Sequence, residues 1–313
     1  MALILTNGLW FAAFFFGGMD VTMNSGQMLL QATSKAGSDV EVNKQEGVLQ
    51  ANQLLQASNS NPQEDVSKNE QQYDKKYWEW QASMNKFGAA FKGDVIRYLI
   101  GGMPTNPTAI LEFGCSGGHI LAGMPIEQKY GVEINPAARA YAKETFPDIK
   151  EVFVRPDDMP PDLMFDVIYT TSVLEHVDCP LCELRKLKVR LKPHGILIVG
   201  LKNDGAALDQ TFSRYKNEPN HHIYTWNPLL LANMLDSAGY TPCSSIGQFD
   251  AWHAPIEVSN YQKDKHAYCT KGLVVGKKQN VYNMWSVSVH DGQCHNYKDR
   301  VNQLLNCQYL KQD

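Results

Sequence analysis

Between residues 109 and 201 the chain alternates short β-rich runs with stretches long enough for crossover helices. Strands that are joined by crossover helices lie parallel, and the helices then cover both faces of the sheet. The alternation therefore predicts an α/β domain. The strands predicted are AILEFG (109–114), KYGVEI (129–134), KEVFVR (150–155), FDVIYTT (165–171) and GILIVGL (195–201).

The chain after these runs has a different pattern. LLLANMLDSAGY (229–240) is typical of an amphipathic helix that ends at a glycine. TPCSSIGQFD (241–250) and HAYCTKGLVVGKK (266–278) are predicted to be two strands without a helix between them, so we expect them to pair antiparallel at the edge of the sheet. Residues 279–313 are expected to form an appendix with a short helix near 299–310.

The first 100 residues divide into three parts. Residues 1–19 form an apolar leader whose run LWFAAFFFGG is shorter than the ~20 residues of a membrane span, so it is either a signal-peptide core or weak anchor, or a loosely packed leader. Residues 20–72 are rich in Gln, Asn, Ser, Lys and Glu and are predicted to be a polar low-complexity linker. Aromatic and apolar residues over 73–100 predict two helices that cap a main domain over 73–278.

The charge and cysteine content limit the partners and the compartment. The net charge of -4 argues against a nucleic-acid partner. The seven cysteines are odd in number and show no repeated metal spacing, so we expect reduced thiols and no metal site. CPLC (179–182) lacks a second pair and is expected to pack at the start of a helix. A cytoplasmic location follows, with the secretory pathway or membrane association through residues 1–19 as the alternative.

The loop after the first strand, LEFGCSGGHIL, indicates the kind of ligand. It lacks the G-K-[ST] ending of a P-loop, and glycines at 114, 117 and 118 do not have the G-x-G-x-x-G spacing of a dinucleotide site. Glu112 would repel a pyrophosphate but can face an ammonium group. Glu133 ends the second strand about 20 residues after the first turn, where a carboxylate can accept both ribose hydroxyls of a nucleoside.

Four segments carry a family resemblance. LEFGCSGGHIL, YGVEINPAARAYA, FDVIYTTSVLEHVDCP and LRKLKVRLKPHGILIVGL resemble the successive motifs of the class I S-adenosylmethionine-dependent methyltransferases, in order and at the usual distances. The LEHV segment is similar to that of the broad group acting on small molecules. The resemblance implies a Rossmann-like, seven-stranded, mostly parallel sheet with an antiparallel last strand and helices on both faces. It also implies S-adenosylmethionine as cofactor and methyl transfer to an O, N or S atom of a small molecule.

The resemblance further implies that the cofactor contacts lie on the loops after the first four strands. VRPDDMPP departs from the family's usual aspartate followed by Leu-Pro, so either of its aspartates is a candidate for the adenine amino group. The residues implied are Glu112, Gly114, Ser116, Gly117 and Gly118 for the methionine half, Glu133 for the ribose, Ile134 for the adenine ring, Asp157 or Asp158 for the adenine amino group, and Thr171 beneath the methyl donor.

The acceptor is expected near NEPNHHIYTWNP (217–228), which follows the fifth strand and precedes a helix. A hydroxyl acceptor needs a general base, for which the candidates are His222, His221 and His176. Tyr224, Trp226 and His119 are candidate substrate contacts. The alternative is that the aromatic residues of this turn pack on the N-terminal helices and that His119 is satisfied within the core.

Two other functions stay open at the level of sequence. The first is a methyltransferase-like domain that binds the cofactor or a partner without catalysis. The second is an NAD-dependent oxidoreductase, which the glycine spacing disfavours.

Overall fold

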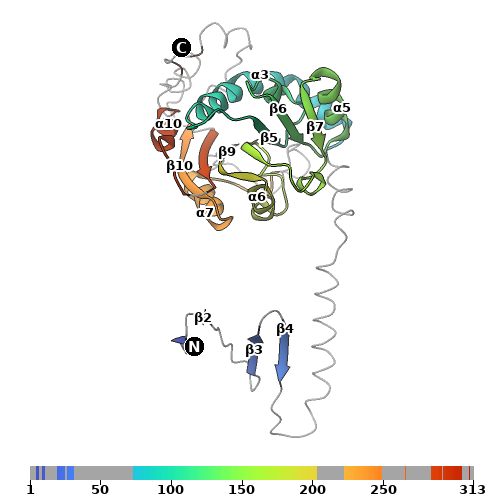
Figure 1. Cartoon of the computed structure of the whole chain (residues 1–313). Helices are drawn as coiled ribbons and strands as arrows, with labels where there is room; N and C mark the ends of the chain where they lie inside the picture. The colour runs from blue at the N-terminus through green and yellow to red at the C-terminus, as the bar shows by residue number, and fades with distance from the viewer. Residues whose placement is uncertain are drawn as a thin grey trace, which may run out of the picture. The chain divides into compact units, whose positions relative to one another are not determined.

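The computed structural model describes residues 5–6, 9–10, 20–24, 27–31, 73–202, 222–248, 265, 283–290, 292–304 and 310 (Figure 1). The chain divides into two compact units, Met1–Pro62 and Gln63–Asp313. Among the described residues, no helix combines the length and the apolar character that crossing a membrane requires.

The first unit contains two antiparallel pairs of short strands. β1 (Leu5–Thr6) pairs with β2 (Leu9–Trp10), and β3 (Asp20–Asn24) pairs with β4 (Gln27–Gln31). The expectation of a linker from residue 20 onward did not include the β3–β4 hairpin.

The second unit is built on one seven-stranded sheet with the order β10-β11-β9-β8-β5-β6-β7. Its five parallel strands confirm the strands predicted between residues 109 and 201. Their bounds are β5 (Ala109–Phe113), β6 (Gln128–Val132), β7 (Ile149–Phe153), β8 (Phe165–Thr171) and β9 (Leu191–Lys202).

The last two strands are β10 (Thr241–Gln248) and β11 (Asn283–Val289). β11 lies between β9 and β10 and runs antiparallel to both, which confirms the antiparallel last strand. The partner of β10 was expected at 266–278, which lies outside the described residues, and 279–313 was expected to be an appendix. That expectation is wrong because β11 is an inner strand. The polar residues Ser286 and Ser288 hid it from a hydropathy pattern, although both are fully buried.

Helices cover both faces of the sheet, as Figure 1 shows. One core layer contains buried residues of α3, α4, α5 and α10, and the other contains buried residues of α6 and α7. Adjacent strand residues alternate between the layers; Ile110 lies in the first and Leu111 in the second. The helices are α3 (Lys75–Ile100), α4 (His119–Ala122), α5 (Pro136–Thr145), the 3-10 turn η1 (Pro156–Asp158), α6 (Pro180–Lys188), α7 (Pro228–Ser237) and α10 (Tyr297–Leu304).

The N-terminal cap of this domain is one helix and not the two predicted. α3 begins after Asp74, whose side chain accepts a hydrogen bond from the Tyr77 amide at 3.0 Å, and continues for 26 residues. No proline interrupts it, and its two internal glycines weaken a helix without breaking it. Phe91, Val95 and Leu99 bury its apolar face in the core.

Four cysteines form disulfide bonds, which corrects the expectation of reduced thiols. Cys179 pairs with Cys182 at the start of α6, and Cys243 of β10 pairs with Cys294 after β11. The two Cα atoms of each pair are 5.2 Å apart, within the range that a disulfide spans. Cys115 is a buried thiol, and the two remaining cysteines lie outside the described residues.

Candidate active site

The glycine loop after β5 is held against two neighbouring strand ends. The Gly114 and Cys115 amides donate to the Val132 carbonyl of β6 at 2.8 and 2.9 Å. Gly114 has a φ of 77°, and a Cβ added there would lie 2.2 Å from Val173 Cγ2, just after β8. Only glycine therefore fits this turn. The loop brings the carboxyl ends of β5, β6 and β8 together, where open α/β sheets bind ligands.

Glu133 connects this loop to α5. Its Oε2 accepts the Ser116 amide at 2.8 Å and its Oε1 accepts the Asn135 amide at 2.7 Å. Ser116 has a φ of 49°, the strained left-handed conformation that directs its amide at the carboxylate. Burial raises the pKa of Glu133, although these amides favour its charged form. Each carboxylate oxygen retains a lone pair for a further donor, such as a ribose hydroxyl.

Glu112 is a buried carboxyl group at the end of β5. It is 2% exposed and accepts a hydrogen bond from the Tyr169 hydroxyl of β8 at 2.8 Å. Burial raises its pKa to about 8, although Tyr169 and Lys92 favour the charged form. A cation beside it, such as an amino-acid ammonium, would favour the ionised carboxylate and lower this pKa. Sequence reasoning identified Glu112 but missed Tyr169 and Lys92.

The first turn of α3 covers the loop. Trp78 is buried, and a Cβ added at Gly117 would lie 2.3 Å from Trp78 Cη2. The Trp78 ring also contacts Tyr141 of α5, with 5.3 Å between centroids. Asn135 Nδ2 donates to the Asp74 carbonyl at 2.9 Å, which ties the start of α3 to the N-cap of α5. The helical cap therefore forms part of the wall of the loop after β5.

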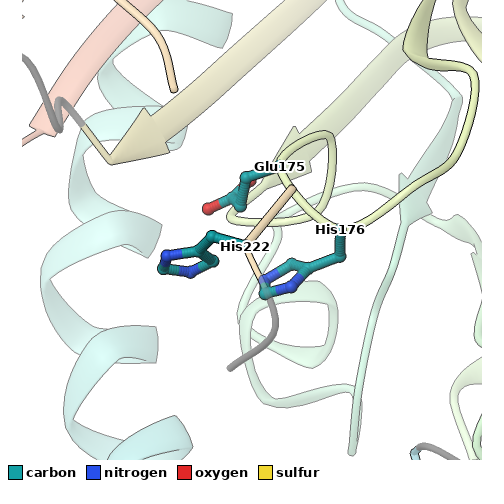
Figure 2. A group of neighbouring side chains, drawn as sticks. All are labelled: Glu175, His176 and His222. Carbon is teal, nitrogen blue, oxygen red and sulfur yellow. The ribbon is translucent and has the colours of Figure 1, made fainter. Parts of the chain in front are cut away.

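A second group of polar side chains lies after β8. Glu175, His176 and His222 each offer a ligand atom, and these atoms lie within 4.8 Å of one another (Figure 2). The two imidazole centroids are 4.8 Å apart. Glu175 is 1% exposed and the histidines are partly buried. The structure thus brings together two of the three predicted bases, while His221 lies outside the described residues.

Backbone and side-chain hydrogen bonds hold the two segments of this group together. The amides of Ile223 and Tyr224 donate to the Glu175 carbonyl at 2.9 and 3.4 Å. The Tyr224 hydroxyl donates to the Asp178 carbonyl at 2.7 Å. Sequence reasoning missed Glu175, although it lies beside His176 in LEHV; only the fold shows that a distant histidine joins it.

Lys92 connects Glu112 of β5 to the turn after β8. Its Nζ donates to Ser172 Oγ at 3.0 Å, and the same charge acts on Glu112. Ser172 has a φ of 55°, so the turns after β5 and β8 each contain a strained serine. Strain of this kind persists where the surrounding structure fixes a functional turn.

The other predicted contacts have varied surroundings. Thr171 is a nearly buried residue at the end of β8, and Ile134 directs its carbonyl to Arg139. Gly118 has a φ of 76° and begins α4. Trp226 is 4% exposed within the core layer of α6 and α7, so its indole packs in the core.

Three of these residues lie against α5, η1 and α6. His119 stacks on Tyr141 at 5.5 Å between centroids and meets Phe146 edge-on. The Asp158 side chain accepts the Arg155 amide and caps η1. Asp157 is exposed and pairs with Lys186 at 2.8 Å. These contacts give each side chain a structural partner.

The seven-stranded, mostly parallel sheet with helices on both faces and antiparallel last strands is a Rossmann-like fold of the class I methyltransferase type. A family model described as a methyltransferase domain matches residues 63–245, more than half of the chain, and the chain belongs to this family. The chain is therefore a class I S-adenosylmethionine-dependent methyltransferase, with S-adenosylmethionine as its methyl donor.

The chain is similar to several solved structures of methyltransferases. A methyltransferase from Haloferax volcanii, in complex with the methyltransferase activator Trm112, has a TM-score of 0.51 at 14% identity, covering 69% of this chain and 97% of that one. A methyltransferase from Thermotoga maritima gives 0.48 at 13% identity, with 69% and 98% covered. The plantazolicin methyltransferase BpumL bound to S-adenosylhomocysteine gives 0.45 at 15% identity, with 74% and 91% covered. A search of curated protein sequences found no match.

Proposed function

We propose that this enzyme methylates a small molecule at an O, N or S atom, and that a hydroxyl group is the favoured acceptor. The observation that carries the proposal is that the imidazole rings of His176 and His222 lie 4.8 Å apart between centroids. His176 follows β8, whose carboxyl end lies beside the glycine loop after β5. An acceptor hydroxyl must lose its proton, and an imidazole can accept that proton as a general base. A carboxylate or thioether acceptor would not need them.

The cofactor position in this proposal rests on the two buried carboxyl groups. Glu133 holds the ribose and Glu112 faces the ammonium group, with Ile134 against the adenine and Thr171 beneath the methyl donor. The hydrogen bonds of Glu133 to the Ser116 and Asn135 amides support this assignment because they fix the carboxylate before the ligand arrives. Asp157 and Asp158 are the weaker assignments because each already has a cationic or capping partner.

The chain's part in the reaction is mainly to align the reactants. S-adenosylmethionine supplies a methyl group that is already activated as a sulfonium. The protein then has to place the acceptor in line with that group, exclude water and promote the loss of the acceptor's proton. The Tyr73 ring meets the His176 ring edge-on, with 5.9 Å between their centroids.

A panel of acceptors tests the proposal. The full chain is incubated with S-adenosylmethionine and matched phenols, alcohols, amines, thiols and carboxylates, and S-adenosylhomocysteine is measured. We expect turnover with hydroxylated molecules and a loss of at least about 100-fold in His222→Asn. His194→Asn is the matched control, because His194 is exposed near the start of β9. No product with any acceptor, or full activity of His222→Asn, would contradict the proposal.

The disulfide bonds bear on the compartment. We propose the secretory pathway over the cytoplasm for this chain, because disulfides form and persist in oxidising environments. Alkylation of thiols in protein from its native source, followed by mass spectrometry, measures their state. Alkylated Cys243 and Cys294 would contradict this location.

A further inference from the structure

The group of Glu175, His176 and His222 has the donor set of a metal site. It offers two imidazole nitrogens and one carboxylate, the ligands of a zinc site that keeps a coordination position open for water or substrate. The same set of two histidines and one carboxylate also binds other divalent transition metals. Magnesium prefers oxygen ligands, so this donor set favours the transition metals over magnesium.

The geometry is close to what one ion requires. Ligand atoms at the usual ~2.1 Å from a shared zinc ion lie at most ~4.2 Å from one another. The three ligand atoms here lie within 4.8 Å, so rotations of the side chains by less than about 1 Å at their tips would place all three around one centre. Figure 2 shows the Glu175 side chain above the His222 and His176 rings, which lie side by side.

The backbone around the group is fixed, as a metal site needs. The Glu175 carbonyl binds the Ile223 amide directly after His222, and the His176 amide donates to the Val173 carbonyl at 2.9 Å. The turn closed by Val173 and His176 thus supplies the ligands Glu175 and His176. The segment bound through the Ile223 amide supplies His222. Ordering these side chains costs less because the backbone that carries them is already held.

The position of the group relates it to the glycine loop. Val173, two residues before Glu175, packs against Gly114 so closely that a Cβ there would meet it at 2.2 Å. Lys92 bonds Ser172 in the same turn. A ligand in the glycine loop and an ion at Glu175 would therefore lie on either side of one short turn.

We propose that Glu175, His176 and His222 bind one divalent transition-metal ion whose open coordination position takes the acceptor oxygen. This role rests on the proposed function. The acceptor hydroxyl releases its proton to solvent when its oxygen binds the ion. That oxygen then forms the new O–C bond while the C–S bond of the sulfonium breaks, and the electron pair of the broken bond goes to sulfur. The histidine pair thus promotes proton loss through a shared cation.

The first experiment measures zinc binding without any acceptor. The full chain with its disulfides intact is freed of metal with a chelator, and Zn²⁺ is titrated in by calorimetry. We expect one ion per chain, and at least about 100-fold weaker binding in Glu175→Gln, His176→Asn and His222→Asn. His194→Asn should bind Zn²⁺ as the unmodified chain does, and Mg²⁺ should bind more weakly. Each variant is checked by circular dichroism and by S-adenosylhomocysteine binding.

A spectroscopic probe tests whether the ion sits at this site. Co²⁺ added to the metal-free chain should give visible absorption bands of a four- or five-coordinate ion, and these bands should be lost in His222→Asn but not in His194→Asn. Absence of Zn²⁺ binding, or equal binding in the ligand variants and the control, would overturn the proposed site.

Activity separates this inference from the proposed function. Metal removal should abolish methylation of a hydroxyl acceptor, and Zn²⁺ should restore it. Turnover that survives metal removal would overturn the metal proposal and leave the proposed function intact. One bound Zn²⁺ with no methylation of any acceptor would overturn the proposed function and support the metal site.

Discussion

The two halves of the candidate site are assembled in different ways. The cofactor half is local in sequence, because Glu112 lies near the end of β5, Ser116 on the turn after it, and Glu133 and Asn135 directly after β6, the next strand. The acceptor half joins His176, after β8, to His222, which follows β9 much further along the chain. A local motif can be recognised from its spacing, whereas a site assembled across the sheet becomes visible only when the fold places its parts together.

The halves also differ in how they are cross-linked. One disulfide lies at the start of α6, which follows β8, and the other joins β10 to the segment after β11. Both therefore belong to the half of the sheet formed by β8 to β11, as does the acceptor half of the site. The cofactor half contains Cys115 as a buried thiol, and burial holds the pKa of that thiol well above its usual value. We therefore expect redox conditions to act on the acceptor side and to spare the cofactor side.

The largest effect on cofactor binding is expected for Glu133→Gln. The neutral amide loses the charge-assisted acceptors for a ribose and for one backbone amide, which corresponds to about 3 kcal/mol and about 100-fold weaker binding of S-adenosylhomocysteine. Calorimetry measures the affinity. Glu151→Gln is the control, because Glu151 forms a half-exposed ion pair with Lys143. Unchanged affinity in Glu133→Gln would remove the cofactor half from the ends of β5 and β6.

The largest effect on the free energy of unfolding is expected when the disulfides are removed. Cys243→Ser combined with Cys294→Ser opens a link with a sequence separation of 51, which costs about 4 kcal/mol of unfolding free energy in the chain-entropy model. Cys179→Ser with Cys182→Ser opens a separation of 3 and should cost about 2 kcal/mol. Urea unfolding measures both. A larger loss for the second pair would contradict the ranking that loop length predicts.

The fold followed from the sequence because hydrophobic periodicity reports directly on strands and crossover helices. The inner strands β8 and β9 carry nearly continuous apolar runs, since parallel strands are buried on both faces, whereas β7 at the edge of the sheet retains Lys150 and Glu151. β11 could not be found in this way, because Ser286 and Ser288 interrupt its pattern while it lies between two other strands. The Ser286 hydroxyl donates to the Ser244 carbonyl of β10 at 3.0 Å, which satisfies this polar group inside the sheet.

The residues of the candidate site were predictable to different degrees, because motif spacing reports on residues that are close in the chain and not on those that only the fold brings together. Glu112 and Glu133 belong to motifs whose spacing fixes their positions, whereas nothing in the spacing of LEHV connects Glu175 to His222, which lies far along the chain. Trp226, a candidate substrate contact in a polar turn, is buried in the core layer of α6 and α7. The disulfides were missed because cysteine spacing in sequence does not show which cysteines meet in space.

A pH-dependent stability is expected from Glu112. Burial raises its pKa to about 8 in the folded chain, whereas the unfolded chain has an ordinary value near 4.5. Between these values the folded state holds a proton that the unfolded state has lost, so stability should fall as pH rises from about 5 to 8 and then level off. The total is on the order of a few kcal/mol. Thermal unfolding across this range measures it.

Glu112→Gln is the matched variant for this measurement. It should lack the Glu112 component of the slope, so its advantage over the unmodified chain grows with pH. Saturating S-adenosylhomocysteine should also flatten the slope of the unmodified chain, because its ammonium group favours the ionised carboxylate. Equal slopes for both chains would exclude Glu112 as the titrating group.

The smallest effect is expected at the contact between α3 and the cofactor half. In Gly117→Ala the new Cβ would lie 2.3 Å from Trp78 Cη2 and 3.0 Å from Tyr141 Cδ1, so the indole must move. Overpacking of this kind costs about 1–3 kcal/mol. We expect roughly tenfold weaker binding of S-adenosylhomocysteine and little change in Zn²⁺ affinity, because the displaced ring packs against Gly117 in the loop after β5 and against Tyr141 of α5.

Gly123→Ala is the matched control, since a Cβ there would have its nearest neighbours at an ordinary 3.4 Å. Trp78→Phe combined with Gly117→Ala should recover part of the lost stability, because the smaller ring leaves room for the methyl group. Calorimetry and urea unfolding of the four chains separate the steric effect from a general loss of folding. If Gly117→Ala weakened Zn²⁺ binding as strongly as cofactor binding, the two halves of the site would be coupled through α3 and could not be treated as independent.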